Sequence, residues 1–518
     1  MKKLTEANQY TEILDSFAWP RLWELFDGGK SDLNLAHECI DRHTGRGEAV
    51  SIMFADGHSE HYTFAEIAVT SSQVAHWFVS QGVRKGDRIA IMLEPGIAFY
   101  AAMFGAIKCG AIAVPMFTLF GPDALALRIN DCHPVMLVTE KDTEQLAADF
   151  PELKIVSPDH HFWQTMRDYP GHYTVNTKAD DLAVFQYTSG TTRALPEAVK
   201  HTHRAIVTLM IAALYGVGLR PGDRYFCPSS PAWGHGLWHG TFAPLALGIH
   251  IASYAGPFKA ERMFQALDEF NIDNMAAAPT VYRMMKNTGS AKQYSISLKK
   301  ASFTGEPMDS GTAEFIRTDL GAEPCSMYGS TEVGVIIVNY PGVSDYVVRP
   351  GALGKAAPGW IVAIVDDKGN RLPLGETGEI AVKKKGGWFC VKDRGYQDED
   401  GYFFHGGRSD DVIISAGWTM SAIEIEDTLM KHDNVVEAVV IGVPDDTRGQ
   451  VVKAFIVCRD PHATAETDIQ QYMKSQLSAH EYPRIIEFVT SLPKTPAGKI
   501  NRKALKERVP QPTTEEAS

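Results

Sequence analysis

Short apolar runs alternate with longer segments of helical character along most of the chain, and this alternation limits the possible folds more than any other feature. Residues 88–116 show the unit clearly: an apolar run gives way, after Pro95-Gly96, to a helical pattern that ends in a second apolar run. Such a unit is typical of parallel strands joined by a helical crossover. The chain is therefore predicted to form an α/β fold, with ligands at the carboxyl ends of its strands.

The same alternation continues further along the chain. Strands are expected at residues 183–187, 274–278, 300–303 and 324–328, each followed by a polar loop or a helix. Pro279-Thr280 is a good pair for the first turn of a helix, and an apolar segment starts at Ala205. Mostly parallel sheets covered by helices are the predicted core of the large N-terminal part.

The pattern changes near residue 351. Residues 360–385 alternate with period two around Asp367-Lys368-Gly369-Asn370, which predicts an antiparallel hairpin. A small α+β unit is expected after that, and residues 510–518 are predicted to be a disordered tail. The expected helices of this unit are 421–432 and 467–477, and its expected strands are 435–443, 451–458 and 485–489.

Composition narrows the class of protein. The 518 residues carry 50 Lys and Arg against 63 Asp and Glu, a net charge of −13, which argues against a nucleic-acid partner or an anionic membrane surface. Seven scattered cysteines without a Cys-x-x-Cys pair argue against a disulfide framework or a structural zinc site. Neither a signal peptide nor an integral membrane segment is recognisable, so a cytoplasmic location is expected. Both a monomer and a dimer fit the sequence.

Two hydroxyl-rich motifs follow predicted strands. The first motif, Tyr187-Thr188-Ser189-Gly190-Thr191-Thr192, can wrap a polyphosphate with hydroxyls and backbone amides. It is no Walker loop, and taken alone it is more often an ordinary Ser/Thr turn. Tyr328-Gly329-Ser330-Thr331-Glu332 offers an aromatic ring for a base, and a hydroxyl and carboxylate for Mg²⁺ and phosphate. A surface turn is the alternative.

Two further motifs are charged. Residues 398–402 and 407–411 form acidic runs that fit either a solvated face or a loop like those that bind calcium, without EF-hand spacing. Residues 493–502 place Lys499 between Gly498 and Ile500 on a tight turn, from which it could deliver a point charge to a phosphate or carboxylate. A merely solubilising lysine is the alternative.

Six motifs, in their order along the chain, resemble those of the acyl-adenylate-forming superfamily. This superfamily contains AMP-forming acyl-CoA synthetases, luciferases and peptide-synthetase adenylation domains. The motifs are TSGTT, GEP, YGSTE, DEDGYF, GRSDD and PKTPAGKINRK. The resemblance runs from about Tyr62 to Lys503 and is closest to the medium-chain and aromatic acyl-CoA synthetase branch. It implies a large N-terminal domain (1–408) with the active site and a β-barrel-like portion. It also implies a hinge (409–411, with Asp410) and a small mobile C-terminal domain (412–518).

The resemblance also implies roles for individual residues, with ATP, Mg²⁺ and coenzyme A as cofactors. Thr188, Glu332 and Lys499 are the implied catalytic residues, with Glu332 on the metal and Lys499 as the adenylation lysine. Lys392 stands where the family has a glycine before its ribose-binding aspartate. The implied nucleotide and coenzyme A contacts are Ser189, Gly190, Thr191, Thr192, Gly305, Glu306, Pro307, Tyr328, Gly329, Thr331, Asp393, Arg408 and Gly417.

The acyl pocket is expected to draw on residues 231–239, where relatives place a gating aromatic residue or histidine. No Arg or Asp occurs in the expected wall segments, which favours an uncharged, hydrophobic monocarboxylic acid as the small-molecule partner. Two indoles favour an aromatic, alicyclic or medium-length acyl group. For Trp and His at these positions, packing in an apolar core is the alternative. The expected wall residues are Trp233, His235, Trp238, Thr304, Val333 and Gly334.

Residues 193–199 depart from the family pattern, since one residue is added and Glu197 replaces the expected lysine. A carboxylate near a triphosphate is unfavourable, so Arg193, Lys200 and His203 are candidate replacement cations. One hypothesis is a weaker hold on pyrophosphate that favours reaction toward ATP. Comparable forward and reverse specificity constants for Glu197→Lys and the parent would dismiss it. Two alternatives stay open: transfer of the acyl group to a carrier protein, and nucleotide binding without turnover.

Overall fold

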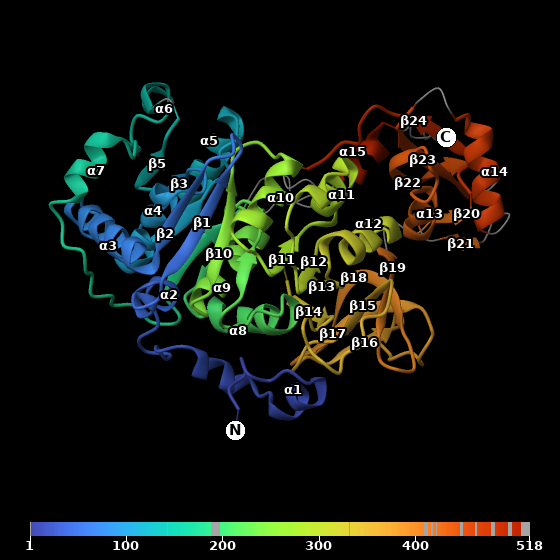
Figure 1. The fold of residues 1–518 in the computed structure, drawn as a ribbon, viewed down its shortest axis with the longest axis horizontal. Helices are drawn as coiled ribbons and strands as arrows, with labels where there is room; N and C mark the ends of the chain where they lie inside the picture. Colours follow the sequence, from blue (N-terminus) through green and yellow to red (C-terminus); the bar gives the residue numbers. More distant parts are fainter. Residues whose placement is uncertain are drawn as a thin grey trace, which may run out of the picture.

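The structure of the chain is a computed structural model (Figure 1). It describes residues 2–141, 143–187, 197–330, 332–408, 413–415, 418–420, 422–445, 449–460, 464–477, 482–495 and 500–508.

A six-stranded sheet forms the first layer of the large N-terminal part. Its strand order is β6-β5-β3-β4-β7-β8, and all neighbours are parallel except β7 and β8. The predicted crossover is confirmed, because α4 (Ile97–Lys108) connects β3 (Arg88–Met92) to β4 (Ile112–Pro115). The other strands are β5 (Met136–Thr139), β6 (Lys154–Val156), β7 (Leu182–Gln186) and β8 (Val199–Thr202).

A 13-stranded sheet runs through the centre of the molecule. Strands β1, β10, β9, β11, β12 and β13 are parallel in that spatial order, and β2 pairs antiparallel to β1 at the edge. The predicted strands at 274–278, 300–303 and 324–328 are confirmed. The bounds are β1 (Glu48–Phe54), β2 (Ser59–Thr63), β9 (Arg224–Phe226), β10 (His250–Ala255), β11 (Asn274–Ala277), β12 (Lys300–Phe303) and β13 (Pro324–Ser330).

Beyond β13 the same sheet continues with antiparallel neighbours. The pairing of β16 with β17 confirms the predicted antiparallel strands, but Asp367–Asn370 is only the first turn of a longer connection. Closure of this region into a barrel stays a prediction. The bounds are β14 (Gly334–Val338), β15 (Ala352–Ala356), β16 (Val362–Val365), β17 (Gly378–Lys384), β18 (Gly387–Gln397) and β19 (Phe403–Arg408).

Helices cover the sheets, and several of them begin at a side-chain cap. Thr63 and Glu66 form a reciprocal capping box at the start of α3, which packs on the almost fully buried α4. The helices are α1 (Tyr10–Ser16), α2 (Leu35–Cys39), α3 (Phe64–Ser80), α5 (Pro122–Cys132), α6 (Thr143–Asp149), α7 (His160–Met166), α8 (Ala205–Ile211), α9 (Ala243–Ala246), α10 (Ala260–Glu269), α11 (Pro279–Thr288) and α12 (Ser310–Phe315). Wider π-helical turns are η3 (Ala212–Gly216), η4 (His235–Phe242) and η6 (Ile316–Leu320), and short 3₁₀ turns are η1 (Trp19–Leu25), η2 (Asp41–His43) and η5 (Ala291–Gln293).

The C-terminal residues form a separate small α+β unit, drawn in orange to red in Figure 1. Its sheet has the order β22-β23-β24, and every helix and strand predicted for it is confirmed. The elements are β20 (Ile413–Ser415), β21 (Trp418–Met420), α13 (Ala422–Leu429), β22 (Val435–Asp445), β23 (Gly449–Cys458), α14 (Glu466–Gln476), β24 (Ile485–Phe488) and α15 (Arg502–Glu507). The predicted hinge and tail lie outside the described residues.

A search of the described part of the chain finds no helix with the length and apolar character needed to cross a membrane.

An ion-pair cluster fixes α11 and α12 on either side of the loop that follows β12. Asp309 caps α12 by accepting a hydrogen bond from the Thr312 amide (2.9 Å), and it faces Arg283 Nε at 3.1 Å and Lys286 Nζ at 3.6 Å. Burial alone would raise the pKa of the Asp309 carboxyl, but these cations and the Thr312 hydrogen bonds outweigh it, so the pKa is lowered.

We expect Asp309→Asn to reduce the free energy of unfolding by about 3 kcal/mol at neutral pH, because it leaves the buried Arg283 charge without its counterion. A lowered pKa contributes stability above the ordinary carboxyl range and loses it as pH falls through the folded-state value. The difference between parent and variant should therefore shrink in acid. Denaturant unfolding at several pH values measures it, and an equal difference at neutral pH and near pH 3 would contradict the ion-pair explanation.

Candidate active site

One large cavity is lined by residues at the strand ends of the central sheet and by residues of the small C-terminal unit. Its volume is about 3460 Å³, well above the roughly 300–1,000 Å³ of a typical small-molecule site, so a nucleotide and a second ligand both have room. All predicted site residues whose side chains are described line it. They are Trp233, His235, Trp238, Thr304, Gly305, Glu306, Pro307, Tyr328, Gly329, Glu332, Val333, Gly334 and Asp393.

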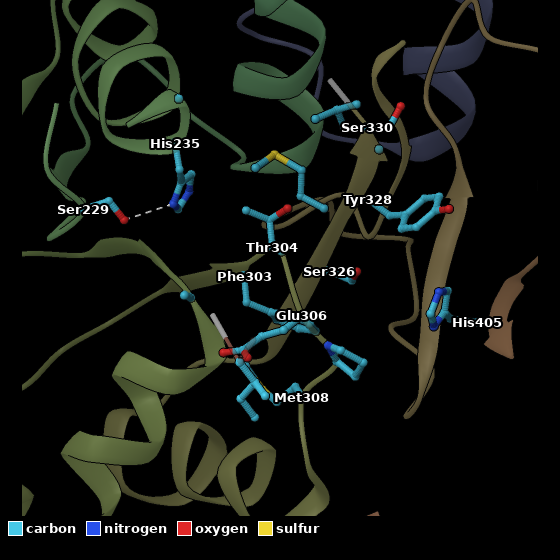
Figure 2. A pocket seen from close by; sticks show the side chains of 18 of the residues that line it. Ser229, His235, Phe303, Thr304, Glu306, Met308, Ser326, Tyr328, Ser330 and His405 are labelled. Carbon is cyan, nitrogen blue, oxygen red and sulfur yellow. Dashed lines mark hydrogen bonds between the residues drawn. The ribbon is translucent and has the colours of Figure 1, made fainter. Parts of the chain in front are cut away.

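Tyr328 and Asp393 meet on one wall, although they lie far apart in the sequence. The Tyr328 hydroxyl donates a hydrogen bond to Asp393 Oδ2 (2.6 Å), and His405 Nε2 lies 3.7 Å from the same oxygen. Asp393 on β18 is also the register partner of Arg408 on β19. An oriented carboxylate beside an aromatic ring suits a ligand that has hydroxyl groups next to a flat base. Figure 2 shows Tyr328 and His405 on one side of the cavity and His235 on the other.

Glu332 supplies a negative charge close to this wall. Hydrogen bonding from Ser330 and from its own backbone, with the charges of Lys392 and Lys384, lowers the pKa of its carboxyl. Lys384 Nζ also donates a hydrogen bond to the Glu332 carbonyl (3.3 Å). Among the described residues no cluster of three or more His, Cys, Asp or Glu side chains is suited to a metal. One ionised carboxylate nevertheless fits Mg²⁺, which usually binds one or two carboxylates together with substrate phosphates.

The loop after β12 is held in place by Glu306. Its Oε1 atom accepts hydrogen bonds from the Thr280 amide (2.7 Å) and the Thr280 hydroxyl (2.5 Å), at the N-terminus of α11. Gly305 has φ +96°, a conformation that favours glycine. Because the Glu306 carboxylate is engaged with Thr280, the contact that residues 305–307 offer the cavity is chiefly that of the loop backbone.

Aromatic and histidine side chains form the opposite wall. Trp233 packs against Phe117 and Phe120 with ring centroids 5.3 and 6.4 Å away, and His235 Nδ1 lies 3.3 Å from the Ser229 hydroxyl. Residue 236 must be glycine here, because a Cβ atom would lie 2.2 Å from the Ser230 carbonyl oxygen. This close approach sets the start of η4, and with it the position of His235.

Several predicted residues cannot be located in this way. Thr188, Ser189, Gly190, Thr191, Thr192, Thr331, Asp410, Gly417 and Lys499 lie outside the described residues, and for Arg408 only the backbone is described. Glu197 does line the cavity.

The prediction of His203 as a replacement cation is wrong. Its Nδ1 atom accepts a hydrogen bond from the Leu35 amide (3.0 Å), and burial lowers its pKa to about 4, so the ring is neutral at pH 7. The Lys200 Nζ atom lies 5.3 Å from the Phe185 ring centroid, and Lys200 does not line the cavity. Arg193 lies outside the described residues.

Sequence reasoning missed other wall residues. His405, Gln186 and His201 line the cavity, and so does Arg128, whose guanidinium lies 3.8 Å from the Phe120 ring centroid and 5.4 Å from that of Tyr187. His239, at the end of the predicted segment 231–239, lines it as well. Arg128 is therefore a cation close to the start of the predicted phosphate loop. The only sequence signal for these residues was histidine repetition in Lys200-His201-Thr202-His203 and along η4.

Comparisons with known proteins agree with this geometry. The family described as "AMP-binding enzyme" matches residues 40–388, and "AMP-binding enzyme C-terminal domain" matches residues 424–499. An acetyl-coenzyme A synthetase of Bacillus subtilis is 32% identical and aligns over 96% of this chain and 94% of its own length. The mouse (Mus musculus) mitochondrial acyl-coenzyme A synthetase ACSM3 is 28% identical, with 92% and 90% covered. The crystal structure of the anthranilate CoA ligase AuaEII with anthranoyl-AMP superposes with a TM-score of 0.82 at 26% identity, over 92% of this chain and 97% of that one.

The residue before Asp393 has an unusual backbone. Lys392 has φ +67°, a left-handed conformation that is strained for a residue with a side chain. We expect Lys392→Gly to raise the free energy of unfolding by about 1 kcal/mol by removing this strain. Lys392→Ala is the matched control, since it removes the side chain but keeps the strain. Denaturant unfolding of all three proteins tests this, and equal stability of the Gly and Ala variants would argue against backbone strain at residue 392.

Proposed function

This chain belongs to the AMP-binding enzyme family of acyl-adenylate-forming acyl-CoA synthetases, and from that premise we propose that it joins a hydrophobic monocarboxylic acid to coenzyme A. The overall reaction uses ATP with Mg²⁺ and releases AMP and pyrophosphate. Joining the acid to AMP creates a mixed anhydride with a good leaving group, which divides a difficult substitution into two easier ones. We propose an aromatic, alicyclic or medium-length acyl group.

The observation that carries the proposal is the convergence of distant segments on one cavity. The ends of β12 and β13, the middle of β18 and the start of η4 contribute its walls. Tyr328 and Asp393 touch each other there, 65 residues apart in sequence. An aromatic ring, an oriented carboxylate and Glu332 border a space large enough for a nucleotide, and we assign the aromatic wall opposite to the acid.

In the first half-reaction, a carboxylate oxygen of the acid attacks the α-phosphorus of ATP, and the bond to pyrophosphate breaks. The chain contributes chiefly by alignment and by compensating charge. Asp393 and Arg408 would hold the ribose of ATP. Tyr328 and the 305–307 loop would contact the adenine. Residues 188–192 and Thr331 would bind the phosphates. Glu332 would hold Mg²⁺, which when bound neutralises phosphate charge. Lys499 would bring its ammonium group to the reacting oxygens.

In the second half-reaction, the coenzyme A sulfur attacks the acyl carbon, the thiol proton passes to solvent, and the bond to AMP breaks. Lys499 must then give way to the pantetheine arm, which we propose passes Gly417. Rotation of residues 412–518 relative to residues 1–408 about Asp410 would exchange the two groups. Conformational steps of this kind commonly separate binding from release.

The proposed acid class is supported by the wall around His235. The predicted wall residues carry no charged side chain and are aromatic, hydroxyl-bearing, aliphatic or glycine. They are Trp233, His235, Trp238, Thr304, Val333 and Gly334. Burying an unpaired charged group against such a wall is costly. A second carboxylate or an amino group on the acid would therefore weaken binding.

The decisive experiment is a panel of about twenty carboxylic acids assayed for AMP formation with ATP, Mg²⁺ and coenzyme A. We expect turnover with uncharged hydrophobic acids and little with amino or dicarboxylic acids. Acid-dependent exchange between ATP and pyrophosphate without coenzyme A-dependent AMP release would favour a carrier protein as acceptor. Absence of both exchange and AMP release would overturn the proposal and leave nucleotide binding alone.

We further expect Lys499→Ala to lower adenylation by at least about 100-fold while supplied acyl-AMP is still converted to the thioester, because the ammonium is needed only in the first step. Lys494→Ala is the matched control. It removes a nearby lysine that forms an ion pair with Glu437 (2.7 Å), and we expect both half-reactions to persist. Equal loss of both half-reactions in Lys499→Ala would contradict the two-conformation scheme.

A further inference from the structure

Three histidines line the wall on which we place the acyl group. His235 and His239 stand four residues apart on the wide turn η4, with ring centroids 5.7 Å apart, and His201 on β8 packs against the Trp238 ring at 4.6 Å. Trp238 Nε1 donates a hydrogen bond to Gln186 Oε1 (2.8 Å), which fixes the indole between β7 and η4. The wall therefore contains two groups of contacting polar side chains, His235 with His239 and His201 with Trp238 and Gln186.

Two of these imidazoles have unused hydrogen-bonding capacity. Within the described residues neither His201 nor His239 forms a side-chain hydrogen bond, and His201 Nε2 and His239 Nδ1 are both buried. A neutral imidazole always carries one N–H donor and one acceptor nitrogen. Burial lowers the pKa of both rings to about 4, so they are neutral at pH 7. These two nitrogens are closed to solvent, so a ligand in the cavity would pair with the other nitrogen of each ring.

Small and apolar side chains also line this cavity. Ala205, Leu209 and Ala212 from α8 and η3 line the cavity beside the rings, together with Thr208. Mostly apolar lining with a few placed polar groups is typical of sites that select a ligand by one hydrogen-bonding substituent. A neutral imidazole carries one donor and one acceptor nitrogen and so suits a hydroxyl group, which both donates and accepts.

We infer that the preferred acid is hydrophobic but carries a neutral hydroxyl group at the end remote from its carboxyl, and that His239 and His201 bind this hydroxyl. The inference rests on the proposed function and adds the substrate class to it. His201 and His239 are specificity-determining residues in this scheme, since neither acts on the reacting carboxyl.

The test compares acids that differ by one hydroxyl: 3-phenylpropanoate with 3-(4-hydroxyphenyl)propanoate, benzoate with 4-hydroxybenzoate, and hexanoate with 6-hydroxyhexanoate. AMP formation with coenzyme A gives kcat/KM for each. We expect the hydroxylated member of at least one pair to be favoured by about tenfold or more in the parent, as a buried hydrogen bond implies. His239→Leu and His201→Leu should reduce that ratio toward one, mainly through the hydroxylated acid.

His239→Gln keeps a donor and an acceptor and should retain part of the preference. His161→Leu is the matched control, because His161 is an exposed histidine on α7 away from the cavity, and its ratio should equal that of the parent. Two results would overturn the inference while leaving the ligase function intact. One is a higher kcat/KM for the unsubstituted acid in every pair. The other is a ratio of hydroxylated to unsubstituted kcat/KM that stays the same in both Leu variants. AMP formation from none of the acids would instead overturn the proposed function, and this inference with it. The comparison within the parent protein is decisive even if a Leu variant fails to fold.

Discussion

The turn between β13 and β14 can close only because residue 329 has no side chain. A Cβ atom on Gly329 would lie 1.9 Å from the Gly334 carbonyl oxygen, a distance that no rearrangement of a side chain could relieve. This contact lies where the central sheet changes from parallel to antiparallel pairing, since β13 is parallel to β12 and antiparallel to β14. Tyr328 lies near the end of β13 and Glu332 in the turn itself. The same constraint therefore brings the antiparallel strands, and with them Asp393, beside the end of β13.

Local sequence patterns predicted the elements well and their long-range pairing poorly. The crossover at 88–116 and the helices and strands of the C-terminal unit were predictable, because each depends on periodicity and capping within a short window. The pairing of β18 with β19 sets Asp393 opposite Arg408, and no local pattern predicts such a register. Only the resemblance to a known family suggested that Tyr328, Asp393 and Lys499 act together, and the described residues test the meeting of the first two alone.

Two of the residues that sequence analysis missed lie on neighbouring strands. Gln186 lies on β7, whose other residues are mostly buried, so its polarity is lost within an apolar pattern, whereas His201 lies on the short edge strand β8 among half-buried and exposed residues. Whether such a residue faces core or cavity depends on the tertiary packing of β7, β8 and η4. His203 shows the converse error: two residues from His201 and equally basic in sequence, it is buried and hydrogen-bonded to the Leu35 amide. Chemical type alone could not separate these two histidines.

The C-terminal unit needs its own rigid anchor if it is to present a lysine to the cavity. Arg502 provides one, because its two terminal nitrogens donate to both oxygens of Glu426 (2.6 and 2.7 Å) and one of them also donates to the Val440 carbonyl (2.8 Å). Asn501 caps α15 at the same point, and residues 494 and 500 form an antiparallel bridge. A paired, hydrogen-bonded fork of this kind fixes direction as well as position. Residues 494 and 500 are thus paired beside the α13–β22 surface, which contributes Glu426 and Glu437 to the cavity lining.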